Sequence, residues 1–187
     1  MKKLLVIPLL LLVAQGAMAV DRLLIFTVAA NYMHPTDAGF RSIYGNSAFY
    51  PDVTGGVRVV GSLYTMVGYG WLNKKGKSPN LNLDVAGSQS FLSAGLGYIL
   101  HLGGTFSVMF EGGYVYARYK EEALNAVVNG GTSGIKADVS LLLLGEEGQI
   151  FAGIKAGYIA ANVSSPSLKL GGPRIALCLG IGLFGEY

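Results

Sequence analysis

The stretch IALCLGIGLFGEY, residues 175–187, alternates between large apolar residues and mostly small ones. A period of two predicts a β-strand with two different faces. In a soluble protein the second face of such a strand is usually polar and wet, but here it consists largely of glycine, alanine and cysteine. The pattern therefore predicts a strand with lipid on one side and the interior of a narrow barrel on the other.

The beginning of the chain has the three parts of a cleavable export signal. Two lysines are followed by an apolar run over residues 4–13 and by a small-x-small cleavage site at residues 17–19. The apolar run is shorter than the roughly 20 residues that a spanning helix needs, which favours cleavage over a membrane anchor. We therefore divide the chain into a signal peptide, residues 1–19, and one β-barrel domain, residues 20–187, and predict export to the bacterial outer membrane.

The composition favours strands and argues against a nucleic-acid partner or a disulfide framework. The net charge of +3 falls to +1 once the two signal lysines are removed, whereas nucleic-acid-binding domains usually carry a basic face. Glycine accounts for 28 of the 187 residues, about twice the usual share of roughly 7%, and it lies within the apolar segments. A single cysteine, Cys178, excludes an internal disulfide bond.

Alternation and turn signals predict eight strands, joined alternately by short and long connections. The short connections fall at residues 60–62, 101–104 and 145–148, and longer loops at about 34–49, 74–85, 120–132 and 164–172. An even strand number, with tight turns at one end, is typical of outer-membrane barrels. We therefore predict an all-β fold, an eight-stranded antiparallel up-and-down transmembrane β-barrel whose turns face the periplasm. The predicted strands are roughly 22–33, 50–60, 62–73, 86–100, 104–119, 133–144, 149–163 and 173–187.

Charged residues indicate which face of each strand points inward, because a charge on the lipid face is costly near the bilayer midplane. We interpret the inward set as an ion-pair network that fills the lumen, since an eight-stranded barrel is just wide enough to be filled by side chains. A charged path for small ions is the alternative. Glu111 and Lys155 are predicted to form a direct or network-linked pair. The lumen set is Arg58, Glu111, Lys136, Asp138 and Lys155.

Aromatic residues sort into two bands, as in the interfacial girdles of such barrels. The girdle residues are Tyr32, Tyr69, Trp71, Tyr114 and Tyr116 at the loop end, and Tyr98, Phe106 and Tyr187 at the turn end. A group of cations lies beyond the loop-end band. These cations belong either to a solvated turn or to a site for lipopolysaccharide phosphates, with which cationic side chains pair well. They are Lys74, Lys75, Lys77, Arg118 and Lys120.

With this architecture the chain resembles the small eight-stranded outer-membrane β-barrel proteins, the OmpA-transmembrane, OmpX and opacity-protein group. In that family a terminal strand ending in an aromatic residue is read by the barrel-assembly machinery. The matching residues here are Leu179, Ile181, Leu183 and Tyr187, although family members usually end in Phe. The family includes adhesins, structural proteins, small channels and a few lipid-A enzymes, so the resemblance implies no single activity.

No catalytic, cofactor or metal site is indicated by residue spacing. A lipid-A enzyme would need a nucleophile, a base and an orienting acid at the outer rim, where His34 with Asp37 or Ser42 is the candidate set. We therefore predict a monomeric, non-enzymatic barrel with a structural or surface-interaction role, whose partners are outer-membrane lipid and lipopolysaccharide. A narrow ion-conducting pore is the first alternative, and a lipid-A-modifying enzyme is the second.

Overall fold

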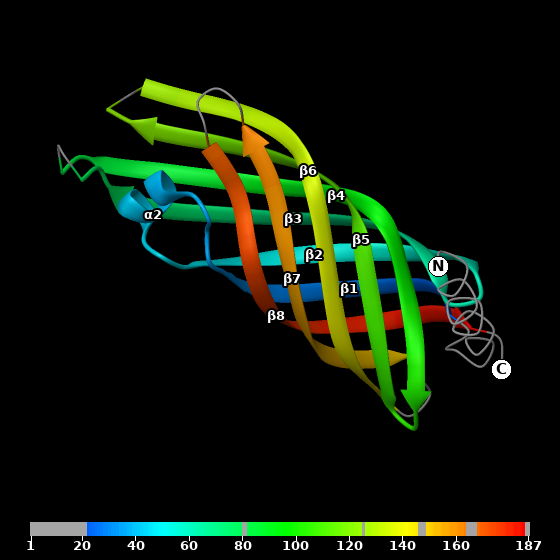
Figure 1. Ribbon diagram of the computed structural model, residues 1–187. Coiled ribbons are helices and arrows are strands. Elements are labelled where there is room, and N and C mark those ends of the chain that lie inside the picture. The colour runs from blue at the N-terminus through cyan, green and yellow to red at the C-terminus, as the bar shows by residue number, and fades with distance from the viewer. Residues whose placement is uncertain (1–21, 80–81, 125, 146–148, 164–167, 186–187) are drawn as a thin grey trace, which may run out of the picture.

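The computed structural model describes residues 22–79, 82–124, 126–145, 149–163 and 168–185. Eight antiparallel strands pair in chain order, and the first also pairs with the last, so the sheet closes into a barrel (Figure 1). The predicted eight-stranded, all-β, up-and-down barrel is confirmed. The elements are β1 (Arg22–Met33), α2 (Ala38–Tyr44), β2 (Ala48–Val60), β3 (Leu63–Lys77), β4 (Asp84–Gly103), β5 (Phe106–Ala123), β6 (Ala126–Leu144), β7 (Ile150–Val163) and β8 (Leu168–Gly185). The predicted signal peptide and Tyr187 lie outside the described residues.

The strands of the β3–β4 and β5–β6 hairpins run further at the loop end than the sequence predicted, and they project beyond the rest of the barrel in Figure 1. The β3–β4 register continues to Lys77 and Asp84, and the β5–β6 register to Ala123 and Ala126. The prediction of loops at 74–85 and 120–132 was therefore wrong for most of those residues. Their polar residues suggested loops, but a hairpin that stands in water can carry polar residues on both faces.

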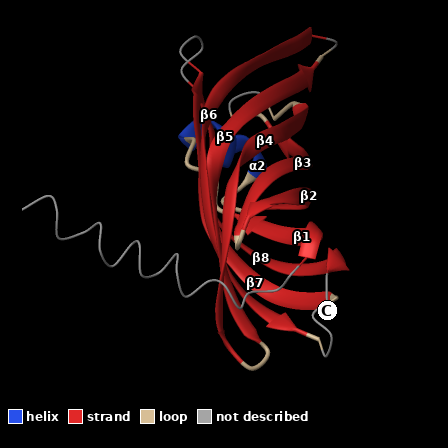
Figure 2. Ribbon diagram, turned by 90° about the vertical axis from the view of Figure 1, so that its right-hand side faces the viewer, coloured by secondary structure: helices blue, strands red, loops and turns tan. Residues whose placement is uncertain are grey.

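The β1–β2 connection holds a short helix, α2, that the sequence did not predict. The Asp37 carboxylate caps it by accepting a hydrogen bond from the Phe40 amide at 2.7 Å, and Gly45 ends it with a φ of 86°, a conformation that favours glycine. Figure 2 shows the helix among the strands at this end of the barrel. No helix in the described part of the chain is long and apolar enough to cross a membrane.

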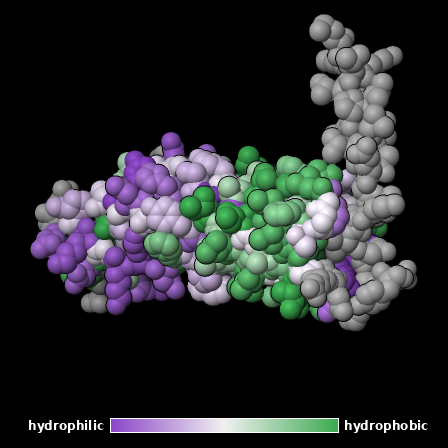
Figure 3. Space-filling view, turned by 90° about the horizontal axis from the view of Figure 1, so that it is seen from below, coloured by the Kyte–Doolittle hydropathy of each residue, from purple (hydrophilic) through white to green (hydrophobic). Residues whose placement is uncertain are grey.

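On the face shown in Figure 3, the outer wall is apolar toward the turn end of the barrel and hydrophilic toward the long hairpins. On β5 the outward apolar series runs from Phe106 to Tyr116 and gives way to Arg118, a length that suits the roughly 9–11 residues of a transmembrane strand. On β8, Leu179 is 66% exposed while Cys178 beside it is 2% exposed. The phase predicted for the last strand is therefore confirmed.

Candidate functional site

The lumen is filled by three layers of side chains. Near the turns lies an apolar group, the turn-side cluster, to which Tyr64, Met109 and Phe151 belong. At the loop end lies a second apolar group, the mouth cluster, to which Phe40 and Tyr44 of α2 belong. Between them lies a charged layer, which we call the ionic layer. The ionic layer consists of Asp52, Glu111, Lys136, Asp138, Lys155 and Arg174.

Arg174 of β8 is the hub of the ionic layer. Its Nη2 and Nε donate to the two carboxylate oxygens of Asp138 at 2.6 and 3.0 Å, the bidentate geometry that gives strong charge-assisted hydrogen bonds. Its Nη1 contacts Asp52 Oδ2 at 3.1 Å, the Tyr50 hydroxyl at 2.7 Å and Asn31 Oδ1 at 3.3 Å. One guanidinium therefore links β8 to β1, β2 and β6 across the lumen.

A second group of ion pairs is centred on Glu111. Lys136 Nζ lies 3.4 Å from Glu111 Oε2 and 3.3 Å from Asp138 Oδ2, so it joins this group to the Arg174 hub. Lys155 Nζ lies 3.3 Å from Glu111 Oε1, which is an ion-pair distance, but without hydrogen-bond geometry. The Glu111–Lys155 pair is therefore looser than the Arg174–Asp138 pair.

The charges of the ionic layer balance, with three cations facing three carboxylates. Lys155 is fully buried, and Asp138 and Arg174 are 2% and 4% exposed. Burying such charges carries a large desolvation cost, which is offset only when each ion is paired and hydrogen-bonded. The layer is consequently a connected network with two key members: removing Arg174 leaves Asp52 buried without a cation, and removing Glu111 leaves Lys155 buried without a carboxylate.

Glycine makes room for the Arg174–Asp138 pair. A Cβ placed on Gly157 of β7 would lie 1.8 Å from Asp138 Oδ1 and 2.6 Å from the Ala137 carbonyl oxygen, so no larger residue fits unless the carboxylate moves. A similar Cβ on Gly112 of β5 meets nothing within 4 Å. The high glycine content thus has at least one specific use, which is to admit a carboxylate to the wall of the lumen.

The structure brings together four of the five lumen residues predicted from the sequence. The fifth, Arg58, also lies on the inward phase of β2, but it is six residues nearer the turn than Asp52 and pairs in register with Tyr64. Arg174 and Asp52 were not predicted from the sequence. Both share the inward phase of their strands, so the same alternation rule could have found them if it had been applied to the ends of β2 and β8.

The mouth cluster is closed by α2. The Tyr44 hydroxyl donates to Glu121 Oε1 of β5 at 3.2 Å, and Lys74 of β3 donates to the carbonyl oxygen of Ser47, just beyond the helix. Burial, followed by the charge of Glu121, raises the pKa of the Tyr44 hydroxyl well above its usual value, so the group keeps its proton. The 34–49 connection therefore folds back over the lumen instead of standing free.

The predicted girdle residues lie on the outward phase of their strands, apart from Tyr187, which is not described. Lys75, Lys77, Arg118 and Lys120 also lie on the exposed outer wall. Lys74 does not, because it has the opposite phase on β3 and points to the mouth. Its prediction as a lipopolysaccharide contact was wrong, since residues at odd spacing along a strand point to opposite faces.

The residues proposed for a lipid-A enzyme make other contacts. Asp37 accepts bonds from the Phe40 and Lys169 amides, and the Ser42 hydroxyl donates to the Gly39 carbonyl oxygen. At the other end, His101 Nδ1 lies 2.6 Å from the Ser107 hydroxyl, but that serine is fully buried. Among the described residues no group of three or more His, Cys, Asp or Glu could hold a metal ion.

Solved structures share this fold at low sequence identity. Neisserial surface protein A matches with a TM-score of 0.62 and 11% identity, over 86% of this chain and 97% of that one. The N-terminal β-barrel domain of Pseudomonas aeruginosa OprF gives 0.54 and 12%, over 87% and 98%. The attachment invasion locus protein Ail of Yersinia pestis gives 0.53 and 9%, over 85% and 94%. No model of a known protein family matches the sequence, and no curated protein does.

At such identities the likeness establishes the fold alone. The chain has the fold of the small eight-stranded outer-membrane β-barrels, and the resemblance predicted from its sequence is confirmed.

Proposed function

We propose that this chain is a sealed outer-membrane β-barrel with a structural or surface-interaction role, without conduction or catalysis. The observation that carries the proposal is the ionic layer, which draws side chains from β2, β5, β6, β7 and β8 into one neutral network. Charges that satisfy one another leave no free counter-charge for a passing ion.

Packing on both sides of the ionic layer supports a closed lumen. Two small hollows lined in part by Lys136 have volumes of about 10 Å³ each, and a cavity needs roughly 10–15 Å³ to hold even one water molecule. The apolar mouth and turn-side clusters add further barriers, because an ion that crosses them would lose its hydration.

The β5–β6 hairpin is the part of the chain best placed to meet a partner outside the membrane. Leu124, Val127 and Val128 near its tip are 73%, 51% and 51% exposed. Among the described residues, the register of β6 with β7 begins only at Gly134 and the Thr132 hydroxyl donates to the Asn162 carbonyl oxygen, so residues 126–131 present a sheet edge. Exposed apolar side chains beside an open strand edge favour contact with another macromolecule.

Planar-bilayer recording tests the sealed barrel against the ion pore. Purified protein is inserted from vesicles, and insertion is verified in the same sample by the different gel migration of unboiled and boiled protein. We expect no steady conductance above that of the protein-free bilayer. A reproducible, ion-selective unit conductance from correctly inserted protein would exclude the sealed lumen.

A further inference from the structure

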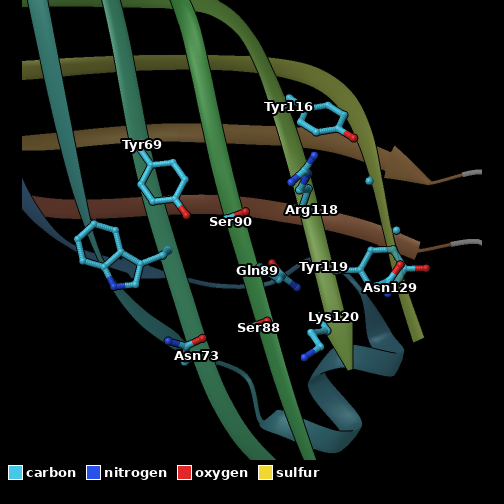
Figure 4. Close-up of a pocket in the computed structure, with 13 residues that line it drawn as sticks. Tyr69, Asn73, Ser88, Gln89, Ser90, Tyr116, Arg118, Tyr119, Lys120 and Asn129 are labelled. Atoms are coloured by element: carbon cyan, nitrogen blue, oxygen red, sulfur yellow. The ribbon is translucent and has the colours of Figure 1, made fainter. Parts of the chain in front are cut away.

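The outer wall carries a groove just beyond the loop-end aromatic band. Its volume is about 700 Å³, and β3, β4, β5 and β6 all contribute to its lining. Figure 4 shows Ser90 and Arg118 on neighbouring strands, with Tyr69 and Tyr116 near them. The groove lies outside the barrel, so it is separate from the ionic layer and independent of whether the lumen conducts.

The strand register explains the shape of the groove. Ser90 of β4 pairs with Trp71 on one side and Arg118 on the other. One row further from the membrane, Ser88 pairs with Asn73 and Lys120. Two small residues thus form a floor between larger walls, and the hollow continues past β5 to Gly131, which pairs with Arg118.

The groove combines an aromatic row below with cations above. Tyr69 and Trp71 stack with ring centroids 5.9 Å apart, and the Arg118 guanidinium lies 5.5 Å from the centre of the Tyr116 ring. Aromatic residues on a membrane-facing wall mark the level of lipid headgroups. Arg118 and Lys120 therefore stand at the height where the phosphates of the outer leaflet lie.

Arg118 and Lys120 differ in their ion-pair partners. Lys120 forms an ion pair with Glu122 on the same strand. In the part of the chain that the structure describes, no carboxylate lies within 4 Å of Arg118. An arginine next to small hydroxyl residues presents several N–H donors in a fixed plane, the arrangement that suits a phosphate group.

We propose that this groove binds a phosphate group of lipopolysaccharide in the outer leaflet. Arg118 holds the phosphate, Lys120 adds a second positive charge, and Ser88 and Ser90 leave room for the headgroup. Trp71 and Tyr116 contact the start of the acyl chains. Further from the membrane, Asp84 of β4 and Glu122 of β5 bring negative charge to the wall. The region that favours an anion therefore ends there.

Trp71 is the single tryptophan of the chain and borders the groove, so its fluorescence reports on binding. Folded protein in zwitterionic micelles is titrated with bisphosphorylated lipid A, and with the same lipid after removal of its phosphates. We expect a saturable change with the first and a much weaker one with the second. Arg118→Gln should weaken binding about tenfold, equivalent to about 1.4 kcal/mol, and Lys120→Gln should weaken it less.

Two further variants separate a built site from general attraction. Lys169→Gln removes one exposed charge from β8, at the loop end of the barrel but away from the groove. This variant should change the affinity less than about twofold, because exposed charges act weakly at a distance. Ser90→Leu fills the floor without altering charge and should weaken binding. Gel migration of unboiled samples verifies that each variant is folded.

Several results would overturn the proposal. Equal affinity for phosphorylated and dephosphorylated lipid would show that the groove does not recognise phosphate. Equal losses of affinity in Arg118→Gln and Lys169→Gln would show that binding is not localised to the groove. Tight binding of sucrose octasulfate, a soluble polyanion without acyl chains, would assign the groove to an extracellular ligand. Full competition by inorganic phosphate would assign it to the free ion.

Discussion

The ionic layer and the mouth cluster fill the same lumen with opposite chemistry. In the ionic layer three cations and three carboxylates meet in pairs with defined geometry. In the mouth cluster, Phe40 and Tyr44 of a short helix pack against strand residues such as Leu72 and Phe91. In apolar packing, deleting one group lowers the free energy of unfolding by roughly the contribution of that group's own contacts. A buried charge that loses its partner lowers it by far more than the ion pair contributed.

Removing the hub should give the largest effect. Arg174→Met keeps much of the volume but leaves Asp52 buried without its cationic partner and leaves Asp138 with Lys136 alone. We expect a loss of about 3–5 kcal/mol in the free energy of unfolding, measured by urea titration in vesicles. Neutralising both carboxylates in the same chain, with Asp138→Asn and Asp52→Asn, should recover part of that loss. No recovery would mean that size rather than charge explains the effect.

Crowding the ionic layer should rank second. Gly157→Ala forces a methyl group into the position of Asp138 Oδ1, and overpacking of this kind typically costs about 1–3 kcal/mol. Gly112→Ala is the matched control, because a Cβ there meets nothing within 4 Å. We expect that control to leave urea midpoints nearly unchanged. Similar losses in the two variants would show that glycine serves the strand backbone and not the ion pair.

The Glu111–Lys155 pair should show a smaller coupling, because its contact at 3.3 Å lacks hydrogen-bond geometry. A double-mutant cycle with Glu111→Gln and Lys155→Met should give a coupling energy within the range of about 0.5–3 kcal/mol seen for contacting residues. The corresponding cycle for Arg174 and Asp138 should give more. If the two cycles rank the other way, the hub has been assigned to the wrong residue.

The mouth cluster should show the smallest effect. Tyr44→Phe removes one hydrogen bond to Glu121 and should cost about 1 kcal/mol. Because the pKa of this hydroxyl is raised in the folded state, the native protein keeps a proton that the unfolded chain loses above about pH 10. Stability from Tyr44 is therefore present below that pH and declines above it, so the difference between wild type and variant should shrink.

The sequence predicted the fold better than the interior. A period of two can be read directly from a single sequence. It predicted the two faces of residues 175–185 and the inward placement of Glu111 and Lys155. The pairing of Arg174 with Asp138 depends on how β6, β7 and β8 stagger around the barrel, and strand periodicity does not specify that stagger. The closure by α2 was missed for a related reason, because Phe40 and Tyr44 gain their burial only from contacts with distant strands.

Cys178 offers the most direct test of the sealed interior. It is the single cysteine of the chain, it faces the lumen in the turn-side cluster, and it is 2% exposed. Wild-type protein in vesicles is treated with a small, charged, water-soluble methanethiosulfonate reagent that has access to both sides, and labelling is followed by mass spectrometry. We expect no modification of the folded barrel and complete modification after unfolding in urea. Rapid labelling of folded protein would contradict the sealed interior, because water and ions would then enter the lumen as far as the turn-side cluster.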